Sequence, residues 1–152
     1  MTAQRTSMWT GAVDRCATGA FEVATRGRGL IEITGELAAF VAGSGVREGL
    51  LTVLCRHTSA SLTIQENADP DVRTDLVAAL DRLAPEDAGW VHHSEGPDDM
   101  PAHVKAMLTG VSLTIPIRGG ALALGTWQGV YLVEHRTRPH RRELALCALG
   151  GS

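Results

Sequence analysis

Six histidines are the side chains best suited to chemistry in this sequence, and three of them could meet in one metal site. They stand at positions 57, 92, 93, 103, 135 and 140. Neutral imidazoles from separate elements suit Zn²⁺ or a similar divalent ion with one open position, and His57, His92 and His103 are the predicted ligands. Their spacing is not a local metal motif, so the alternative is that they are unrelated polar residues in loops.

The string "HTSASLTIQEN", residues 57–67, places hydroxyl groups beside the first imidazole and a carboxylate at its far end. A buried imidazole needs hydrogen-bond partners, and the hydroxyl groups that follow it are the expected ones. Ser59 and Asn67 are predicted to contact substrate. Glu66 is the candidate general base, and turn or capping chemistry is the alternative for this end of the string.

A second polar group lies in the C-terminal third of the chain. Trp127 could form an aromatic wall of a site, and Gln128 follows it as a further predicted substrate contact. Arg136, with Arg141 or Arg142, could clamp a phosphate, because a guanidinium group binds phosphate oxygens in a bidentate manner. The alternative is that these arginines are simply solvated between two strands.

Composition narrows the classes of partner. The chain has 152 residues, a formal charge of -3 and an isoelectric point near 6.0, so electrostatics do not favour nucleic acid or an anionic membrane. No apolar stretch is long enough for a signal peptide or a membrane span, and the expected location is the cytoplasm. Three widely spaced cysteines form neither a metal pair nor a disulfide framework and are interpreted as reduced, small hydrophobic residues.

The predicted elements form one domain over residues 1–152. Alternating or apolar runs predict strands over 8–15, 21–26, 30–33, 51–55, 61–65, 111–118, 121–125, 126–135 and 142–148. Thr34 can cap a first helix, Asp69 with Pro70 begins a second whose apolar stripe should be buried, and residues 101–110 form a short third. Both faces of the 126–135 strand look covered, which predicts a central strand or contact with another subunit. The fold class is α+β: an antiparallel β-sandwich-like core covered by two main helices.

Three segments together resemble the YjbQ family, often labelled secondary thiamine-phosphate synthase. They are "HTSASLTIQENADPDVRTDL", "EGPDDMPAHVKA" and "SLTIPIRGGALALGTWQGVYLVEHR", and the resemblance covers about residues 8–149. It implies an α+β fold assembled as a compact homotrimer, with His57, His92 and His103 matching the recurrent histidines of a metal or anion pocket. His93 is an extra neighbour, and "EHR" at 134–136 departs from the acidic residue and "GPR" of many members.

The resemblance also implies a reaction. A thiamine-phosphate synthase-like transferase would join a hydroxymethylpyrimidine pyrophosphate to a thiazole phosphate and release pyrophosphate. His57, His92 and His103 would hold a divalent metal, such as Zn²⁺ or Mg²⁺, or the phosphate itself. The residues predicted to be catalytic are His57, His103 and, as general base in a hydrolase, Glu66. The chain lacks the acidic cluster typical of Mg²⁺–pyrophosphate sites, so two alternatives stand. One is a metal-dependent hydrolase of a small phosphorylated metabolite, and the other is a non-catalytic metal- or anion-binding trimer.

Overall fold

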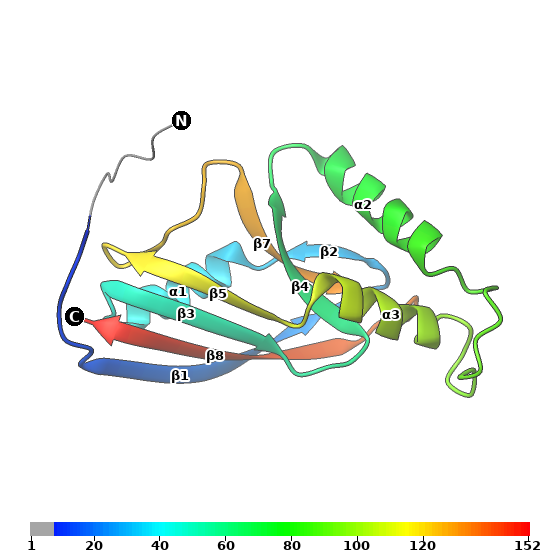
Figure 1. Ribbon diagram of the computed structural model, residues 1–152, viewed down its shortest axis with the longest axis horizontal. Helices are drawn as coiled ribbons and strands as arrows, with labels where there is room; N and C mark the ends of the chain where they lie inside the picture. Colours follow the sequence, from blue (N-terminus) through cyan, green and yellow to red (C-terminus); the bar gives the residue numbers. More distant parts are fainter. Residues whose placement is uncertain (1–7) are drawn as a thin grey trace.

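Two antiparallel sheets enclose the core in the computed structural model, which describes residues 8–152 (Figure 1). The larger sheet has the strand order β1 (Arg15–Ala24), β8 (Arg141–Gly151), β3 (Glu48–Cys55), β5 (Ser112–Arg118) and β6 (Ala121–Leu122). The smaller sheet has the order β2 (Gly29–Glu32), β7 (Gln128–Glu134) and β4 (Ala60–Glu66). The predicted α+β class is confirmed.

The core lies between these sheets and follows the alternation of the strands. Leu51 and Val53 on β3 are fully buried, and they belong to one apolar cluster with Leu62 on β4 and Leu132 on β7. Helix α1 (Thr34–Ser44) adds its own buried side chains to the same cluster. One continuous core therefore supports both sheets, which is typical of layered packing.

Three helices complete the fold, in agreement with the two main helices and the short third helix that the sequence predicts. Helix α2 (Pro70–Leu83) lies beside the smaller sheet, and α3 (Asp99–Thr109) crosses near the beginning of β4 (Figure 1). Asp69 caps α2 as predicted, because its carboxylate accepts a hydrogen bond from the amide of Asp71 at 2.9 Å. The predicted buried stripe on α2 is wrong, since no residue of the helix is fully buried and Leu83 is 67% exposed.

Two N-terminal predictions are also wrong. Residues 8–14 form no strand, and β1 runs without a break from Arg15 to Ala24 because all ten of its residues pair with β8. Thr34 does not cap α1, since Ile33 occupies that position. The Thr34 hydroxyl instead accepts a hydrogen bond from the amide of Val130, at 2.9 Å, and so ties α1 to β7.

Strand β7 is shorter than the predicted 126–135 segment but occupies the predicted central position. It pairs with β2 on one side and β4 on the other, and its residues from 129 to 134 are all buried. Helix α1, the larger sheet and α2 cover it within a single chain, so its burial needs no second subunit. None of the helices over residues 8–152 is long and apolar enough to cross a membrane.

Candidate functional site

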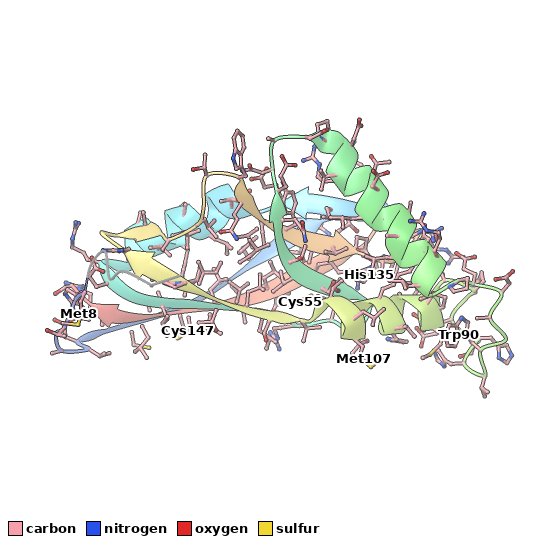
Figure 2. The ribbon with its side chains drawn as sticks, turned by 45° about the horizontal axis from the view of Figure 1, so that its top comes forward. Met8, Cys55, Trp90, Met107, His135 and Cys147 are labelled. Carbon is pink, nitrogen blue, oxygen red and sulfur yellow. The ribbon has the colours of Figure 1, made fainter. Side chains whose placement is uncertain are left out.

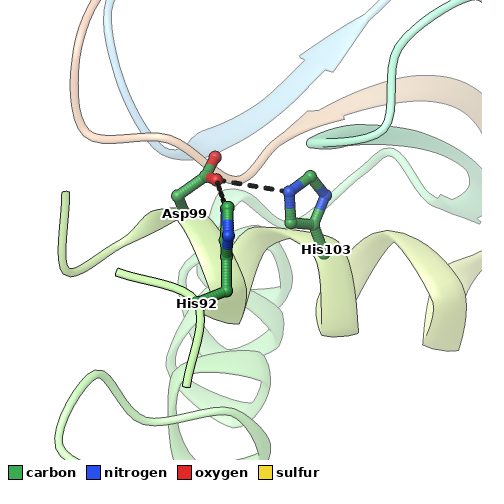
Figure 3. Close-up of side chains that lie close together, drawn as sticks. All are labelled: His92, Asp99 and His103. Carbon is green, nitrogen blue, oxygen red and sulfur yellow. Dashed lines mark hydrogen bonds and ion pairs between the residues drawn. The ribbon is translucent and has the colours of Figure 1, made fainter. Parts of the chain in front are cut away.

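Two histidines and one carboxylate meet at the beginning of α3 (Figure 3). Asp99 and His103 are four residues apart on this helix, so they lie on the same face, one turn apart. His92 reaches the same point from the preceding loop. Its Nε2 lies 2.7 Å from Asp99 Oδ2, and His103 Nε2 lies 3.3 Å from the same oxygen. The three potential ligand atoms all lie within 4.8 Å of one another.

His103 is oriented by a hydrogen bond on the far side of its ring. Its Nδ1 lies 2.9 Å from the carbonyl oxygen of Thr58, which can only accept, so Nδ1 carries the proton. This bond fixes the ring so that Nε2 faces Asp99. Histidines that bind metal ions are commonly held in this way, with the second nitrogen donating to a carbonyl or carboxylate.

Asp99 is buried and yet charged. Only 1% of its surface is exposed, and this burial alone would raise the pKa of the carboxyl group. The hydrogen bond to His92 and the positive charge of Arg136 outweigh that effect, and the pKa of Asp99 falls below its ordinary value. The site therefore contains an ionised carboxylate at neutral pH, which is the form that binds a divalent cation.

Arg136, the predicted phosphate clamp, donates hydrogen bonds from its side chain to the segment that carries the site. Its Nε donates to Asp98 Oδ2 at 3.1 Å, one terminal nitrogen donates to Asp99 Oδ1, and the other donates to the Glu95 carbonyl oxygen at 2.8 Å. Burial opposes ionisation of Asp98, but hydrogen bonds from Thr137 and Arg136 lower its pKa to about 2. Arg136 therefore holds this loop against the end of β7. All three nitrogens of its guanidinium group have partners, so no pair of donors is left for a phosphate.

His57 lies in the wall of the neighbouring pocket and outside the three-residue cluster. Its Nε2 accepts a hydrogen bond from the amide of Glu143 at 2.7 Å. Burial and the positive charge of Arg142 lower its pKa, so the ring is neutral at pH 7 and its proton resides on Nδ1. The structure thus brings together two of the three predicted metal ligands, with Asp99 in place of His57.

A pocket of about 570 Å³ lies beside the cluster and shares His103 with it. Its polar lining comes from Arg56, His57 and Thr58, and its apolar lining includes Ala106 and the exposed Met107, labelled in Figure 2. The remaining lining residues are Cys55, Gly110 and Val111. A small molecule in this pocket would have an apolar wall along α3 and polar groups along the loop after β3.

Four of the predicted site residues lie at the other end of the smaller sheet. Glu66 pairs with Gln128 in the β4–β7 register, whereas Ala60 at the histidine end pairs with Glu134. Six residues of strand separate the two ends by about 20 Å. Glu66 accepts a hydrogen bond from the amide of Asp69. Asn67, Trp127 and Gln128 make turn contacts, and the Trp127 side chain is exposed. These contacts are Asn67 N to Trp127 O and Gly125 N to Gln128 Oε1.

Ser59, the last predicted contact, and two histidines outside the predicted site, His93 and His135, all have partners within the fold. Ser59 is buried, and its carbonyl oxygen is 3.4 Å from a guanidinium nitrogen of Arg142. His93 is exposed and bonds the Val91 carbonyl oxygen within its own loop. His135 is buried beside the Ser61 hydroxyl, at 2.8 Å, away from the cluster. None of these three side chains lines the pocket.

Asp99 is the site residue that sequence reasoning missed. The predicted third helix begins at residue 101, which leaves Asp99 outside it and hides the Asp-x-x-x-His spacing of Asp99 and His103 on one helix face. The helix in fact begins at Asp99. An acidic residue in the first turn favours that start through the helix dipole, and the spacing could have identified the pair.

Comparisons with known proteins agree on the family. Residues 19–151 match the family model described as UPF0047 protein YjbQ-like. The UPF0047 protein sll1880 of Synechocystis is 55% identical over 129 residues, which make up 84% of this chain and 88% of that protein. The YjbQ protein of Salmonella typhimurium is 47% identical over 77% of this chain and 86% of its own.

Solved structures give the same result. A crystal structure of a protein from Aeropyrum pernix superimposes with a TM-score of 0.82 at 32% identity, covering 89% of this chain and 99% of that one. A YjbQ/UPF0047 family protein from Clostridium acetobutylicum gives a TM-score of 0.78 at 40% identity, covering 84% and 96%. The resemblance inferred from the sequence is confirmed, and this chain belongs to the UPF0047 (YjbQ-like) family.

Proposed function

We propose that the protein is a metal-dependent hydrolase of a small phosphorylated metabolite, with a divalent ion bound by His92, Asp99 and His103. The observation that carries this proposal is the convergence of two Nε2 atoms and one carboxylate oxygen within 4.8 Å. Two imidazoles and one carboxylate form a ligand set typical of catalytic zinc, which keeps a further position open.

The residues present fit such an ion. Nε2 of His103 lies 3.3 Å from the carboxylate of Asp99, so a divalent ion that replaces the proton on this nitrogen can bind both groups. Thr58 orients the histidine and Arg136 orients the carboxylate, so both ligands have outer partners. When bound, a divalent ion would supply Lewis acidity and lower the pKa of a water molecule.

The pocket residues supply the remaining functions. His57 presents a protonated Nδ1, because its Nε2 is occupied by the Glu143 amide, and is suited to donate a hydrogen bond to a phosphate oxygen. Arg56 adds a positive charge at the rim, although it is shared with Glu143. The apolar wall that includes Met107 suits the uncharged part of a metabolite.

A thiamine-phosphate synthase-like transferase is the second candidate. The same ion could neutralise a departing pyrophosphate, and the apolar wall of the pocket could hold a pyrimidine or thiazole ring. The hydrolase ranks first because Trp127, Gln128 and Asn67 lie at the opposite end of the sheet and Arg136 is occupied.

The test uses protein stripped with a chelator and then reloaded with Zn²⁺, with Mg²⁺ or with neither. Each sample is assayed for phosphate release from a panel of small phosphate esters, and for pyrophosphate release from pyrimidine pyrophosphate with thiazole phosphate. The hydrolase proposal expects metal-dependent phosphate release that is lost in His103→Ala and kept in His93→Ala. Pyrophosphate release that needs both substrates would favour the transferase. Metal binding with no turnover in either assay would contradict both enzyme proposals and indicate a non-catalytic metal-binding protein.

A further inference from the structure

Two cysteines far apart in the sequence lie next to each other on the larger sheet. Strand β1 pairs with β8 so that Thr18 is opposite Cys147 and Cys16 is opposite Leu149. Paired residues point to the same face of a sheet, and residues two apart on a strand share a face. Cys16 and Cys147 are therefore diagonal neighbours on one face, at a spacing at which side chains can still touch.

The thiols differ in exposure. Cys16 is exposed and Cys147 is half-buried, whereas Cys55 lies in the core. Burial raises the pKa of Cys147, and contact with the Cys16 thiol raises it further. In Figure 2, Cys147 lies on the larger sheet, well away from Met107 beside the candidate pocket.

We propose that Cys16 and Cys147 form an oxidisable dithiol, a modification site for small disulfides of the glutathione type. The Cys16 thiolate attacks one sulfur of the small disulfide, forming a mixed disulfide and releasing one thiolate of the reagent. The Cys147 thiolate then attacks the Cys16 sulfur, which closes the Cys16–Cys147 bond and releases the second thiolate. Each protein thiol loses one proton, and the disulfide reagent receives the two electrons.

The geometry predicts a bond that is easily reduced. Diagonal neighbours in a sheet have Cα atoms about 7–8 Å apart, and most disulfides need a Cα separation below about 7 Å. Closing the bond therefore requires a local shift of the backbone. Cys16 can supply it because β1 is an edge strand and Cys16 is its second residue. A strained and accessible disulfide has a high reduction potential and is typical of labile, not structural, bridges.

The test exposes reduced, full-length protein to oxidised glutathione, removes the reagent, and measures free thiols after denaturation together with intact mass. The reduced chain has three cysteines. The titratable thiols should fall to one, the mass should fall by two hydrogen atoms with no adduct, and peptide mapping should find Cys16 joined to Cys147. Dithiothreitol should restore all three thiols.

Single serine variants separate the two roles. Cys147→Ser should accumulate a stable glutathione adduct on Cys16, because no second thiol resolves it. Cys16→Ser should stay unmodified over the same exposure, since Cys147 is half-buried. Three remaining thiols in the wild type, a lasting adduct on its Cys16, or a disulfide between two chains would each overturn the proposal. Because peptide mapping is done on the wild type, poor folding of a variant would not leave the question open.

Discussion

Nε2 of His103 lies 3.3 Å from Oδ2 of Asp99, while Nδ1 of the same ring donates a hydrogen bond to the carbonyl oxygen of Thr58. The second contact turns Nε2 toward the carboxylate, where a proton or a metal ion can lie between the two atoms. A divalent ion satisfies both groups at once. A bound metal ion would displace a proton held between them, so metal binding is the decisive test of this pair.

Replacing His103 with alanine should abolish stoichiometric zinc binding and leave the fold intact. The side chain is one of three potential ligands, so its loss should weaken affinity by at least about 100-fold, no less than the loss of an outer partner. The side chain is one-third exposed, so its removal opens no core cavity. Zinc content after dialysis and circular dichroism measure the two effects.

His93→Ala is the matched control for this experiment. His93 is next to His92 in the sequence but is exposed, and the one described hydrogen bond of its side chain is to the Val91 carbonyl oxygen. It should keep wild-type zinc content. Equal zinc content in His103→Ala and His93→Ala would remove His103 from the site.

Arg136 should act on the metal site through Asp99. Lysine at this position keeps one positive charge but loses the fork that reaches Asp98, Asp99 and the Glu95 carbonyl oxygen. Arg136→Lys should therefore weaken zinc affinity by about 10–100-fold, as expected for an outer partner of a ligand. Competition with a chromogenic chelator measures this affinity. Arg138→Lys, at an exposed position in the same turn, should change nothing, and similar losses in both variants would contradict a specific role.

Glu66→Gln tests whether the predicted general base belongs to the site. In the structure its carboxylate accepts from the Asp69 amide, about 20 Å along β4 from the histidine end. Glutamine keeps an acceptor oxygen for that amide, so turnover and the melting temperature should both stay near wild type. Asp99→Asn should lose turnover under the same assay. A selective loss in Glu66→Gln would restore this residue as the base.

The homotrimer implied by the family resemblance stays a prediction. Large apolar side chains are exposed near the C-terminal ends of two helices, with Met107 at 77%, Leu108 at 55% and Leu83 at 67%. Such groups commonly become covered in an assembly. Light scattering should give a native mass three times the chain mass of 16.1 kDa. A single-chain mass across a tenfold dilution series would contradict it.

Local patterns predicted the fold better than the site. The apolar run predicted the strand over 51–55, whose Leu51 and Val53 are fully buried, and turn chemistry predicted the Asp69 cap, because both signals depend on neighbours in the sequence. Thr34 was misassigned because its hydroxyl bonds Val130, a residue 96 positions away. No local signal contains that contact.

Contacts between residues far apart in the sequence also limited the prediction of the site. His92 and His103 were identified as residue types able to bind metal, but strand parity gave no information on the ring nitrogens of His57. Its Nε2 is occupied by the amide of Glu143, 86 residues further along the chain. Strand register between β3 and β8 creates that contact. Asp99 could have been found from its spacing to His103, because helical neighbours are local.

A buried polar cluster beneath α2 offers a separate test of the fold. His135 is 2% exposed, and its Nε2 lies 2.8 Å from the Ser61 hydroxyl. Lys105 is equally buried, and its Nζ lies 2.5 Å from Asp81 Oδ1 on α2. Burial and the charge of Lys105 lower the pKa of His135 to about 4. The ring is therefore neutral in the folded protein above about pH 4.

This depressed pKa should make folding stability depend on pH between about 6.5 and 4. In that window the unfolded chain binds a proton at His135 and the folded chain does not, so the free energy of unfolding falls as the pH falls. The full shift of the pKa corresponds to about 3 kcal/mol of unfolding free energy. Burial and the positive charges of Lys105 and Arg142 disfavour protonation of the ring, and they outweigh the negative charges of Glu134 and Asp81, which favour it. His135→Gln removes the titration, so its stability should fall by about 3 kcal/mol less than that of the wild type over this window. Urea unfolding at a series of pH values measures the difference, and parallel curves for the two proteins would show that His135 is protonated in the folded state.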